Sequence, residues 1–368
     1  MRPPLRIAVI AHNHFPIREP YAGGLEAHVG QLTRALVNAG HQVTLFAAAG
    51  SDVGIAHPSL TVEPLKRSTA ASVPFPLPGA VKESDHQAFV TLMARLAGKN
   101  AAKYDVIHNH SLHYVPIITA ARLSTPVLTT LHTPPFPLLE AAVGAVRGNG
   151  LTFAAVSRAA AATWAHVGIE RLAVVPNGID LARWPAGRGG RYLVWSGRIV
   201  PEKGPHLAIE AARRAGWRLV LAGPVVDAGF FRRQITPHLG DGVTYAGHLN
   251  QHLLASLVGG AAAALVTPLW EEPYGLVAAE AMSCGTPVVA FARGGIPELV
   301  DEHCGRLVAP QDVVAMARAI PVVSKLDRTQ VRRSAIARHG VAAMAAKYVA
   351  LYRNLLVDSG ARARRRSA

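Results

Sequence analysis

The sequence is poor in cysteine, and this shortage narrows the classes of protein it can encode. Cys284 and Cys304 are the only cysteines among 368 residues. Two are too few for a disulfide framework or a cysteine-based zinc site. We therefore expect both to be small, buried hydrophobic side chains in a reducing cytosol.

A signal peptide and a long uninterrupted apolar helix are also lacking. Residues 1–6 lead directly into a strand-like run without a signal-peptide pattern, so we expect a cytoplasmic protein. Leu253–Trp270 is free of charge over 18 residues, close to the length of a membrane span. Gly259, Gly260 and Pro268 interrupt it, and a short helix followed by a buried strand explains it better.

Basic residues are plentiful, although only 7 of the 38 are lysine, and they give a net charge of +15. Such a chain attracts anions, which include phosphate esters, acidic lipids and nucleic acid. Arg362, Arg364, Arg365 and Arg366 lie in the tail, 358–368. We favour a solvated, disordered tail, and weak peripheral contact with a membrane or acceptor is the competing interpretation. No nucleic-acid partner is expected, because no recognisable binding module accompanies the charge.

Strand-like apolar runs alternate with helical patterns along the chain. This rhythm predicts an α/β protein whose parallel sheets are covered on both faces. A Gly-rich stretch, WPAGRGG at 184–190, reads as a linker between two halves, 1–184 and 191–342, and a last amphipathic helix follows. The strands are expected at 6–11, 42–47, 106–108, 127–131, 153–156, 172–175, 192–196, 218–222, 243–246, 263–267 and 287–291, and further helices at 26–39, 206–215 and 275–284.

Ligands of open α/β sheets bind at the carboxyl ends of strands, so the strand-to-helix turns are the candidate sites. In the first of these turns, Gly23-Gly24 precedes a helix, which permits close backbone approach and offers N–H groups to an anion. In the turn SGRIVPEKG, Arg198 and Lys203 are placed to hold or neutralise a diphosphate, or are simply solvated.

The segment from Thr267 to Ala290 has two carboxylates separated by seven residues, Glu272 and Glu280. Glu272 follows a strand, and its carboxylate can accept hydrogen bonds from sugar hydroxyls. Glu280 lies on the next helix and can accept two from a ribose. The helix start between them offers N–H groups to phosphate. The alternative is an amphipathic helix with incidental acids.

Histidines also occur at strand ends: His108 and His110 in VIHNHS, and His132 in TLHTPP. A neutral imidazole can donate to or accept from a sugar hydroxyl. Three such residues can also ligate a metal, but their irregular spacing and the lack of nearby acids argue against it. We predict no metal site, and each histidine is as readily structural as functional.

Taken together, these segments resemble the retaining glycosyltransferases of family 4, which have the GT-B fold. The resemblance rests on the E-x7-E block, GRIVPEKG, VVPNGID and the early Gly-Gly loop, in the family's order from Arg6 to about Val308. It implies two Rossmann-like domains facing each other across a cleft. The C-terminal helix, about 343–357, would cross back to the first domain.

The resemblance also implies a role for each matched residue. Arg198 and Lys203 would bind the donor diphosphate and stabilise the leaving group, and Glu272 would hold sugar hydroxyls. Glu280 would hold the ribose, and His110 aligns with the family's sugar-contacting histidine. His110, Arg198, Lys203 and Glu272 form the predicted catalytic set. The other predicted donor contacts are Gly23, Gly24, Gly223, Leu249, Tyr274 (where the family usually has Phe), Gly275 and Leu276, and His132 is a candidate sugar or acceptor contact.

Two segments, 14–28 and 128–140, more narrowly resemble the branch named UDP-glucose:tetrahydrobiopterin glucosyltransferase. That branch implies UDP-glucose as donor and a pterin as acceptor. No Asp-x-Asp pair occurs, which agrees with metal-independent chemistry, and no cofactor is expected besides the donor substrate. Loops 11–25, 68–86 and 133–150 are expected to select the acceptor. The stretch 68–82 has the composition of either a mobile lid or a disordered segment.

Several alternatives stay open at this point. One is a mannosyl or galactosyl transferase acting on a lipid or glycan. A sugar-nucleotide 2-epimerase is disfavoured, because its catalytic acids do not match the E-x7-E block. A non-catalytic nucleotide-sugar or anion-binding protein is the alternative outside the enzymes.

Overall fold

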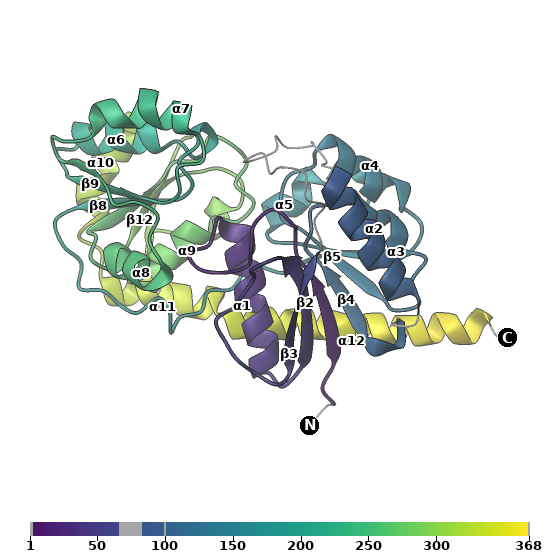
Figure 1. Cartoon of the computed structure of the whole chain (residues 1–368). Coiled ribbons are helices and arrows are strands. Elements are labelled where there is room, and N and C mark those ends of the chain that lie inside the picture. The colour runs from purple at the N-terminus through teal and green to yellow at the C-terminus, as the bar shows by residue number, and fades with distance from the viewer. Residues whose placement is uncertain (1–2, 66–82, 99–100, 367–368) are drawn as a thin grey trace. The chain divides into compact units, whose positions relative to one another are not determined.

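The computed structural model describes residues 3–65, 83–98 and 101–366 and divides into two compact α/β units (Figure 1). The first unit consists of Met1–Arg18, Leu25–Pro176 and Ala342–Ala368. The second consists of Glu19–Gly24 and Asn177–Val341. The stretch 68–82, considered as a lid, lies outside the described residues.

The first unit has a seven-stranded parallel sheet in the order β3-β2-β1-β4-β5-β6-β7. β1 lies between β2 and β4, where Ile7 pairs with Val43 and Val106. The strands are β1 (Arg6–Ile10), β2 (Gln42–Ala48), β3 (Leu60–Leu65), β4 (Val106–Asn109), β5 (Val127–Leu131), β6 (Thr152–Ala155) and β7 (Leu172–Val174). The helices are α1 (Gly24–Asn38), α2 (Glu83–Ala97), η1 (Ala101–Lys103), α3 (Tyr114–Ala120), α4 (Pro137–Ala145), α5 (Arg158–Thr163), η2 (Ala165–Val167) and α12 (Val341–Arg366).

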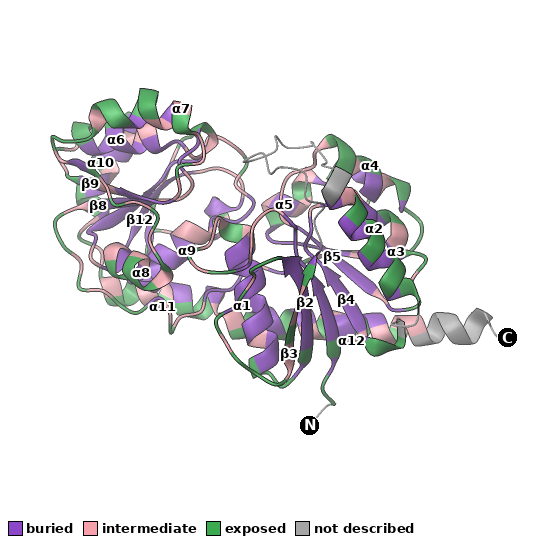
Figure 2. Ribbon diagram, in the orientation of Figure 1, coloured by how far each residue is buried: buried purple, intermediate pink, exposed green. Residues whose placement is uncertain are grey.

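The central strands of this sheet are buried along nearly their whole length (Figure 2). On one face, Phe89 of α2 and Val115 of α3 pack with Ile10 and Phe46 in one apolar cluster. On the other face, Tyr352 of α12 reaches the sheet. Burial on both faces explains why β1 and β2 read as nearly continuous apolar runs in the sequence.

The second unit has a six-stranded parallel sheet in the order β10-β9-β8-β11-β12-β13. The strands are β8 (Leu193–Ser196), β9 (Leu219–Ala222), β10 (Val243–Tyr245), β11 (Ala263–Val266), β12 (Val288–Phe291) and β13 (Gly305–Val308). The helices are η3 (Pro201–Lys203), α6 (Pro205–Arg214), α7 (Ala228–Phe230), the π-helical turn η4 (Phe231–Ile235), η5 (Thr236–His238), α8 (Gln251–Gly259), α9 (Leu276–Ser283), η6 (Ile296–Glu298), α10 (Val313–Val323) and α11 (Arg328–His339).

Helices cover both faces of this second sheet (Figure 1). α6 and α10 pack on one face, where Ile209 and Met316 join Leu221 and Phe291 in one cluster. α8, α9 and α11 lie on the other face. The predicted fold class, two Rossmann-like α/β units with parallel sheets, is confirmed by this topology.

The stretch 184–190, which we expected to link the halves, instead belongs to the second unit. Gly187 N–H donates to Cys284 O at 2.9 Å, and Gly189 N–H donates to Gly259 O at 3.0 Å. The Arg328 guanidinium also donates to Gly187 O at 3.1 Å. The chain passes from one compact unit to the other at Pro176 and Asn177.

The predicted C-terminal helix is present as α12, and it belongs to the first unit as the resemblance implied. It is longer than 343–357, because it continues to Arg366 through most of the expected disordered tail. Cys284 and Cys304 are free and buried, as predicted. Within the described ranges, no helix has both the length and the apolar character that crossing a bilayer requires.

Two glycines of the second unit form a matched pair for testing backbone constraint. Gly204 and Gly216 have nearly the same left-handed conformation, with φ of +64° and +70°. A Cβ on Gly216 would meet nothing within 4 Å, whereas one on Gly204 would lie 2.1 Å from Thr267 O. We expect Gly216→Ala to lower the free energy of unfolding by about 1–2 kcal/mol through backbone strain. Gly204→Ala should cost about 1–3 kcal/mol more through overpacking. Urea unfolding measures both, and equal losses would contradict the assigned close approach.

Candidate active site

The turns that follow β8 and β11 bring a lysine and a glutamate together in the second unit. Lys203 Nζ lies 2.5 Å from Glu272 Oε2, and Trp270 Nε1–H donates to the same oxygen at 2.8 Å. The Lys203 ammonium also lies 4.8 Å from the centre of the Trp270 ring, within range of a cation–π interaction. The side chains of Lys203 and Glu272 are only 20% and 15% exposed. The two charges therefore form a partly desolvated group whose remaining open side faces solvent.

Backbone contacts fix the two turns against each other. Thr267 Oγ1–H donates to Gly204 O at 2.8 Å and lies 3.1 Å from Lys203 O. The second turn is held in the same way, because Gly295 N–H donates to Glu272 O at 2.7 Å. A Cβ on Gly294 would lie 2.1 Å from Glu272 O, so this approach requires glycine. The backbone that carries Lys203 and Glu272 is thus held by the short Thr267 side chain and by main-chain contacts.

Three other predicted donor contacts occupy neighbouring turns of this sheet. Arg198 follows β8, with its guanidinium 3.8 Å from the Glu202 carboxylate. Gly223 follows β9, and a Cβ there would lie 1.8 Å from Gly197 O, which gives this glycine a packing reason besides any ligand contact. Leu249 is half-buried in the turn between β10 and α8. These residues share the carboxyl edge of the sheet with Lys203. Their contacts with a donor stay predictions.

The Gly23-Gly24 loop belongs to the second unit, although it precedes a helix of the first. A Cβ on Gly24 would lie 3.0 Å from Leu276 Cδ1, so Gly24 adjoins the start of α9. Nearby, His248 Nε2 lies 3.0 Å from Tyr21 O. The structure therefore brings two of the predicted donor-binding segments, the Gly-Gly loop and the E-x7-E block, side by side.

The hydroxyl of Tyr274 bonds to other parts of the second unit and not to the Lys203–Glu272 pair. Its side chain is buried, and its hydroxyl donates to Asn177 O at 2.7 Å and lies 2.9 Å from His339 Nδ1. Burial raises the pKa of Tyr274 well above its ordinary value. The hydroxyl that distinguishes it from the family's Phe thus links the E-x7-E block to the segment where the chain enters the second unit. Its neighbour Gly275 has φ of +96° and caps α9.

Glu280 lies on α9 with only 9% of its surface exposed. Burial raises the pKa of its carboxyl from 4.5 to about 8. The group is therefore mostly protonated at neutral pH in the free protein. Carboxyl groups whose pKa is raised by burial concentrate at functional sites. Glu280 is therefore a candidate functional residue.

The predicted histidines lie in the first unit. His110 follows β4 and His132 follows β5, and His110 Nδ1 lies 2.8 Å from His132 Nε2. His108, considered with them, has a structural role instead. Its ring nitrogens lie 2.6 Å from Tyr352 Oη and 2.7 Å from Thr130 Oγ1. His108 thereby fastens α12 to the sheet.

A fourth histidine, His28 of α1, completes a buried group that the sequence had not indicated. Burial lowers the pKa of His28 to about 4. Burial, together with the neighbouring imidazoles, lowers the pKa of His110 and His132 well below the ordinary value. All three rings are therefore neutral at physiological pH.

Two residues of these sites were missed from the sequence. Trp270 lies two residues before Glu272 in a block already singled out, and an aromatic residue at that spacing was the available signal. His28 follows Gly24 by one helical turn, but a lone histidine on a helix gives no indication of its neighbours. Only the fold reveals that it meets two strand ends.

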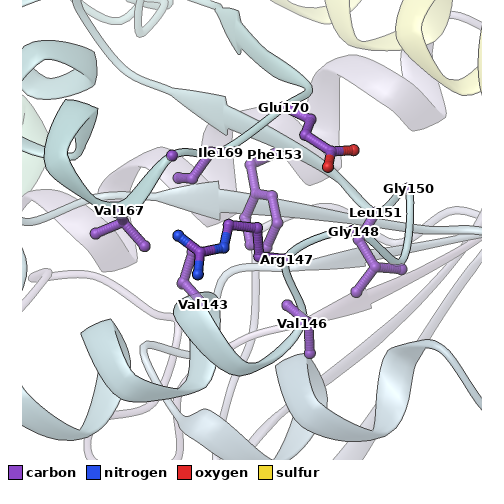
Figure 3. A pocket seen from close by; sticks show the side chains of 11 residues that line it. Val143, Val146, Arg147, Gly148, Gly150, Leu151, Phe153, Val167, Ile169 and Glu170 are labelled. Carbon is purple, nitrogen blue, oxygen red and sulfur yellow. The ribbon is translucent and has the colours of Figure 1, made fainter.

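A small pocket in the first unit takes no part in this site (Figure 3). Its volume is about 10 Å³, room for roughly one water molecule. Its walls are mainly apolar, with Arg147 and Glu170 beside it. Part of the wall comes from 133–150, a stretch expected to select the acceptor, but none of the individually predicted site residues lines it. We assign it no function.

Comparison with known proteins identifies the family. A family model described as Glycosyltransferase Family 4 matches residues 22–183, and one described as Glycosyl transferases group 1 matches residues 180–339. A glycogen synthase of Mycobacterium tuberculosis is 30% identical, with 91% of this chain and 89% of that protein covered. A D-inositol 3-phosphate glycosyltransferase of Acidothermus cellulolyticus is also 30% identical, with 86% and 82% covered.

The chain therefore belongs to this family of glycosyltransferases, and it is an enzyme of the transferase class. Among solved structures, HepE from Anabaena in complex with UDP-glucose is 19% identical and has a TM-score of 0.74. The match covers 95% of this chain and 100% of the other. At that identity the likeness shows the fold, which is the GT-B arrangement of two Rossmann-like domains.

Because of Glu280, the free energy of unfolding of the second unit should fall as the pH rises. Its folded-state pKa, about 8, lies above the ordinary value of 4.5. Its contribution to stability is therefore fully present below about pH 4.5 and is lost as the pH rises through about 8. Relative to Glu280→Gln, wild-type unfolding free energy should fall by up to about 1.4 kcal/mol per pH unit across this window. Urea unfolding of both proteins at several pH values measures the difference. A difference that is constant or rises with pH would contradict the assigned pKa.

Proposed function

We propose that this protein transfers a hexose from a nucleotide sugar to an acceptor hydroxyl with retention of configuration at the anomeric carbon. The observation that carries the proposal is the group formed by Lys203, Glu272 and Trp270 at the carboxyl edge of the second sheet. It provides a cation for a phosphate and a carboxylate for sugar hydroxyls within one hydrogen bond of each other.

Donor binding would redistribute the contacts of this group. In the free protein the charge of Lys203 is compensated by Glu272 at 2.5 Å. A diphosphate is a stronger partner for Lys203 and Arg198, because it offers more charge and more acceptor oxygens. Glu272 would then be released to accept hydrogen bonds from sugar hydroxyls. The free-state ion pair holds both side chains in place until the donor arrives.

The remaining roles follow from the family resemblance and stay predictions. Glu280 would bind the ribose, with Gly223 and Leu249 near the base. Gly23, Gly24 and the backbone of residues 274–276 would contact the diphosphate or sugar. His110 would contact the donor sugar, and His132 the sugar or the acceptor.

In the reaction we propose, the bond between the anomeric carbon and the phosphate oxygen breaks. The bond to the acceptor oxygen forms on the same face of the sugar, and the acceptor proton passes to the departing phosphate. Arg198 and Lys203 would stabilise the charge that develops on the leaving group, without a metal ion. The protein's contribution is then positioning and electrostatic stabilisation.

For the donor we propose UDP-glucose, and for the acceptor a hydroxyl of a small molecule, with a pterin as the first to test. Both follow from the branch resemblance of residues 14–28 and 128–140. Glucose and the uridine base are the narrower part of the proposal, and mannose and galactose are the alternative sugars.

A donor screen tests the substrate class. UDP-, GDP-, ADP- and TDP-sugars should be compared by thermal shift and by release of the nucleotide. A donor present at about 100 times its dissociation constant should stabilise the fold by roughly 2.7 kcal/mol. We expect UDP-glucose to give the largest shift and slow release of UDP. A larger shift with another donor would replace UDP-glucose, and no shift with any donor would contradict the nucleotide-sugar site.

Substitution of the charged pair tests the catalytic assignment. Glu272→Ala and Lys203→Ala should each lower turnover on the order of 10²- to 10³-fold, the usual cost of removing one group that stabilises the transition state. Glu210→Ala is the matched control. The Glu210 carboxylate lies on α6, is 46% exposed, pairs with Arg214 at 2.8 Å and should be dispensable for turnover. Wild-type turnover in either test variant, or an equal loss in the control, would refute the assignment.

A further inference from the structure

Three histidines from distant parts of the chain gather at the carboxyl edge of the first sheet. His28 comes from α1, His110 follows β4, and His132 follows β5. One ring nitrogen of each lies within 4.8 Å of one nitrogen of both others. Their ring centres are 5.3 Å (His28–His110), 4.9 Å (His28–His132) and 5.1 Å (His110–His132) apart. We call His28, His110 and His132 the histidine triad.

The triad is under-satisfied in hydrogen bonds. Neither ring nitrogen of His28 has a partner among the described residues. His28 is 1% exposed, so water does not replace the missing partners from the surface. Buried polar groups in native proteins are nearly always hydrogen-bonded, and each exception calls for an explanation such as an absent ion.

We propose that the histidine triad is a binding site for one divalent transition-metal ion of the class that imidazole prefers, such as Zn²⁺, Co²⁺, Ni²⁺ or Cu²⁺. Three imidazoles are a complete protein ligand set for a zinc-type ion that keeps its fourth position open.

The distances require only a small rearrangement. With bonds of about 2.0–2.1 Å to a tetrahedral ion, two ligand nitrogens lie roughly 3.3 Å apart. His110 Nδ1 and His132 Nε2 are 2.8 Å apart and share one proton in a hydrogen bond. An ion bound between these two nitrogens would replace the hydrogen bond, and the ring that carries the shared proton would hold it on its other nitrogen and stay neutral. The two rings would have to separate by about half an ångström, and His28 would have to move toward them. His132 is half-buried and gives the ion a route from the surface.

Neighbouring groups limit the site to these three ligands. His108 lies against His110 with ring centres 3.8 Å apart, but both of its nitrogens are engaged by Tyr352 and Thr130. Tyr348 closes another side of His28, with ring centres 6.3 Å apart. No carboxylate belongs to the group of ligand atoms found among the described residues.

Occupancy of the triad has a consequence that rests on the proposed function. If His110 contacts the donor sugar, an ion bound to His110 removes that contact. A metal ion would then inhibit transfer, and a chelator would restore it. This differs from metal-dependent catalysis, in which the chelator would abolish activity.

Direct metal binding tests the site without reference to activity. The full chain, free of any histidine tag, is titrated with Co²⁺, whose visible absorption reports a nitrogen-ligated tetrahedral site. We expect one equivalent to bind to the wild type. His28→Gln and His132→Gln should each weaken binding by at least tenfold, because each removes one of three ligands. His206→Gln, a half-buried histidine of the second unit, is the matched control and should bind as the wild type does.

Melting temperatures in metal-free buffer show whether each variant folds. If His28→Gln fails to fold, His132→Gln, whose side chain is partly exposed, provides the test. Absence of saturable Co²⁺ binding in the wild type, or equal affinity in wild type and His132→Gln, would overturn the proposal. Where turnover can be measured, Zn²⁺ should inhibit the wild type reversibly. A failure to detect any turnover would count against the proposed function and leave the binding result unaffected.

Discussion

Burial of both sheet faces is the constraint on which the rest of this structure depends. A parallel strand covered by helices on both sides has no room for an unpaired polar side chain, so polar groups collect where the strands end. Lys203, Glu272, His110 and His132 all lie just beyond the carboxyl end of a strand. His108 is one of several buried polar residues that lie within a strand. It is tolerated because Tyr352 and Thr130 supply partners for both of its ring nitrogens.

The same constraint explains which parts of the fold could be predicted. Central strands such as β5 and β12 are buried throughout, and both were placed correctly within a residue. β3 and β13 were missed because they are sheet edges with partly exposed residues, and their sequences, LTVEPL and GRLV, lack a continuous apolar run. The stretch 184–190 was predicted to be a linker because it is rich in glycine, but it is packed within the second unit. Its glycines permit close backbone packing, since a Cβ on Gly187 would lie 2.1 Å from Gly259 O.

The candidate sites divide in the same way. Glu272 and Lys203 could be predicted because each belongs to a local pattern at a strand end, and the fold needed only to bring two neighbouring turns together. Trp270 was overlooked because an aromatic residue beside a strand is usually core. His28 could not have been found locally, because its partners are more than eighty residues away in the sequence. The irregular spacing that argued against a metal says little about residues brought together by parallel strands, whose ends meet regardless of the length of chain between them.

The glycines at the strand ends of the second unit have a consequence for how this enzyme can diverge. At Gly204, Gly223 and Gly294 the backbone of one turn rests directly against a carbonyl oxygen of another. The spacing of the turns is thus set by main-chain atoms that every sequence shares, and no side chain can adjust it. Any residue with a Cβ at these positions would collide with the facing carbonyl oxygen. A change of substrate specificity during evolution must therefore come from the residues between these glycines, while the spacing of the turns stays constant.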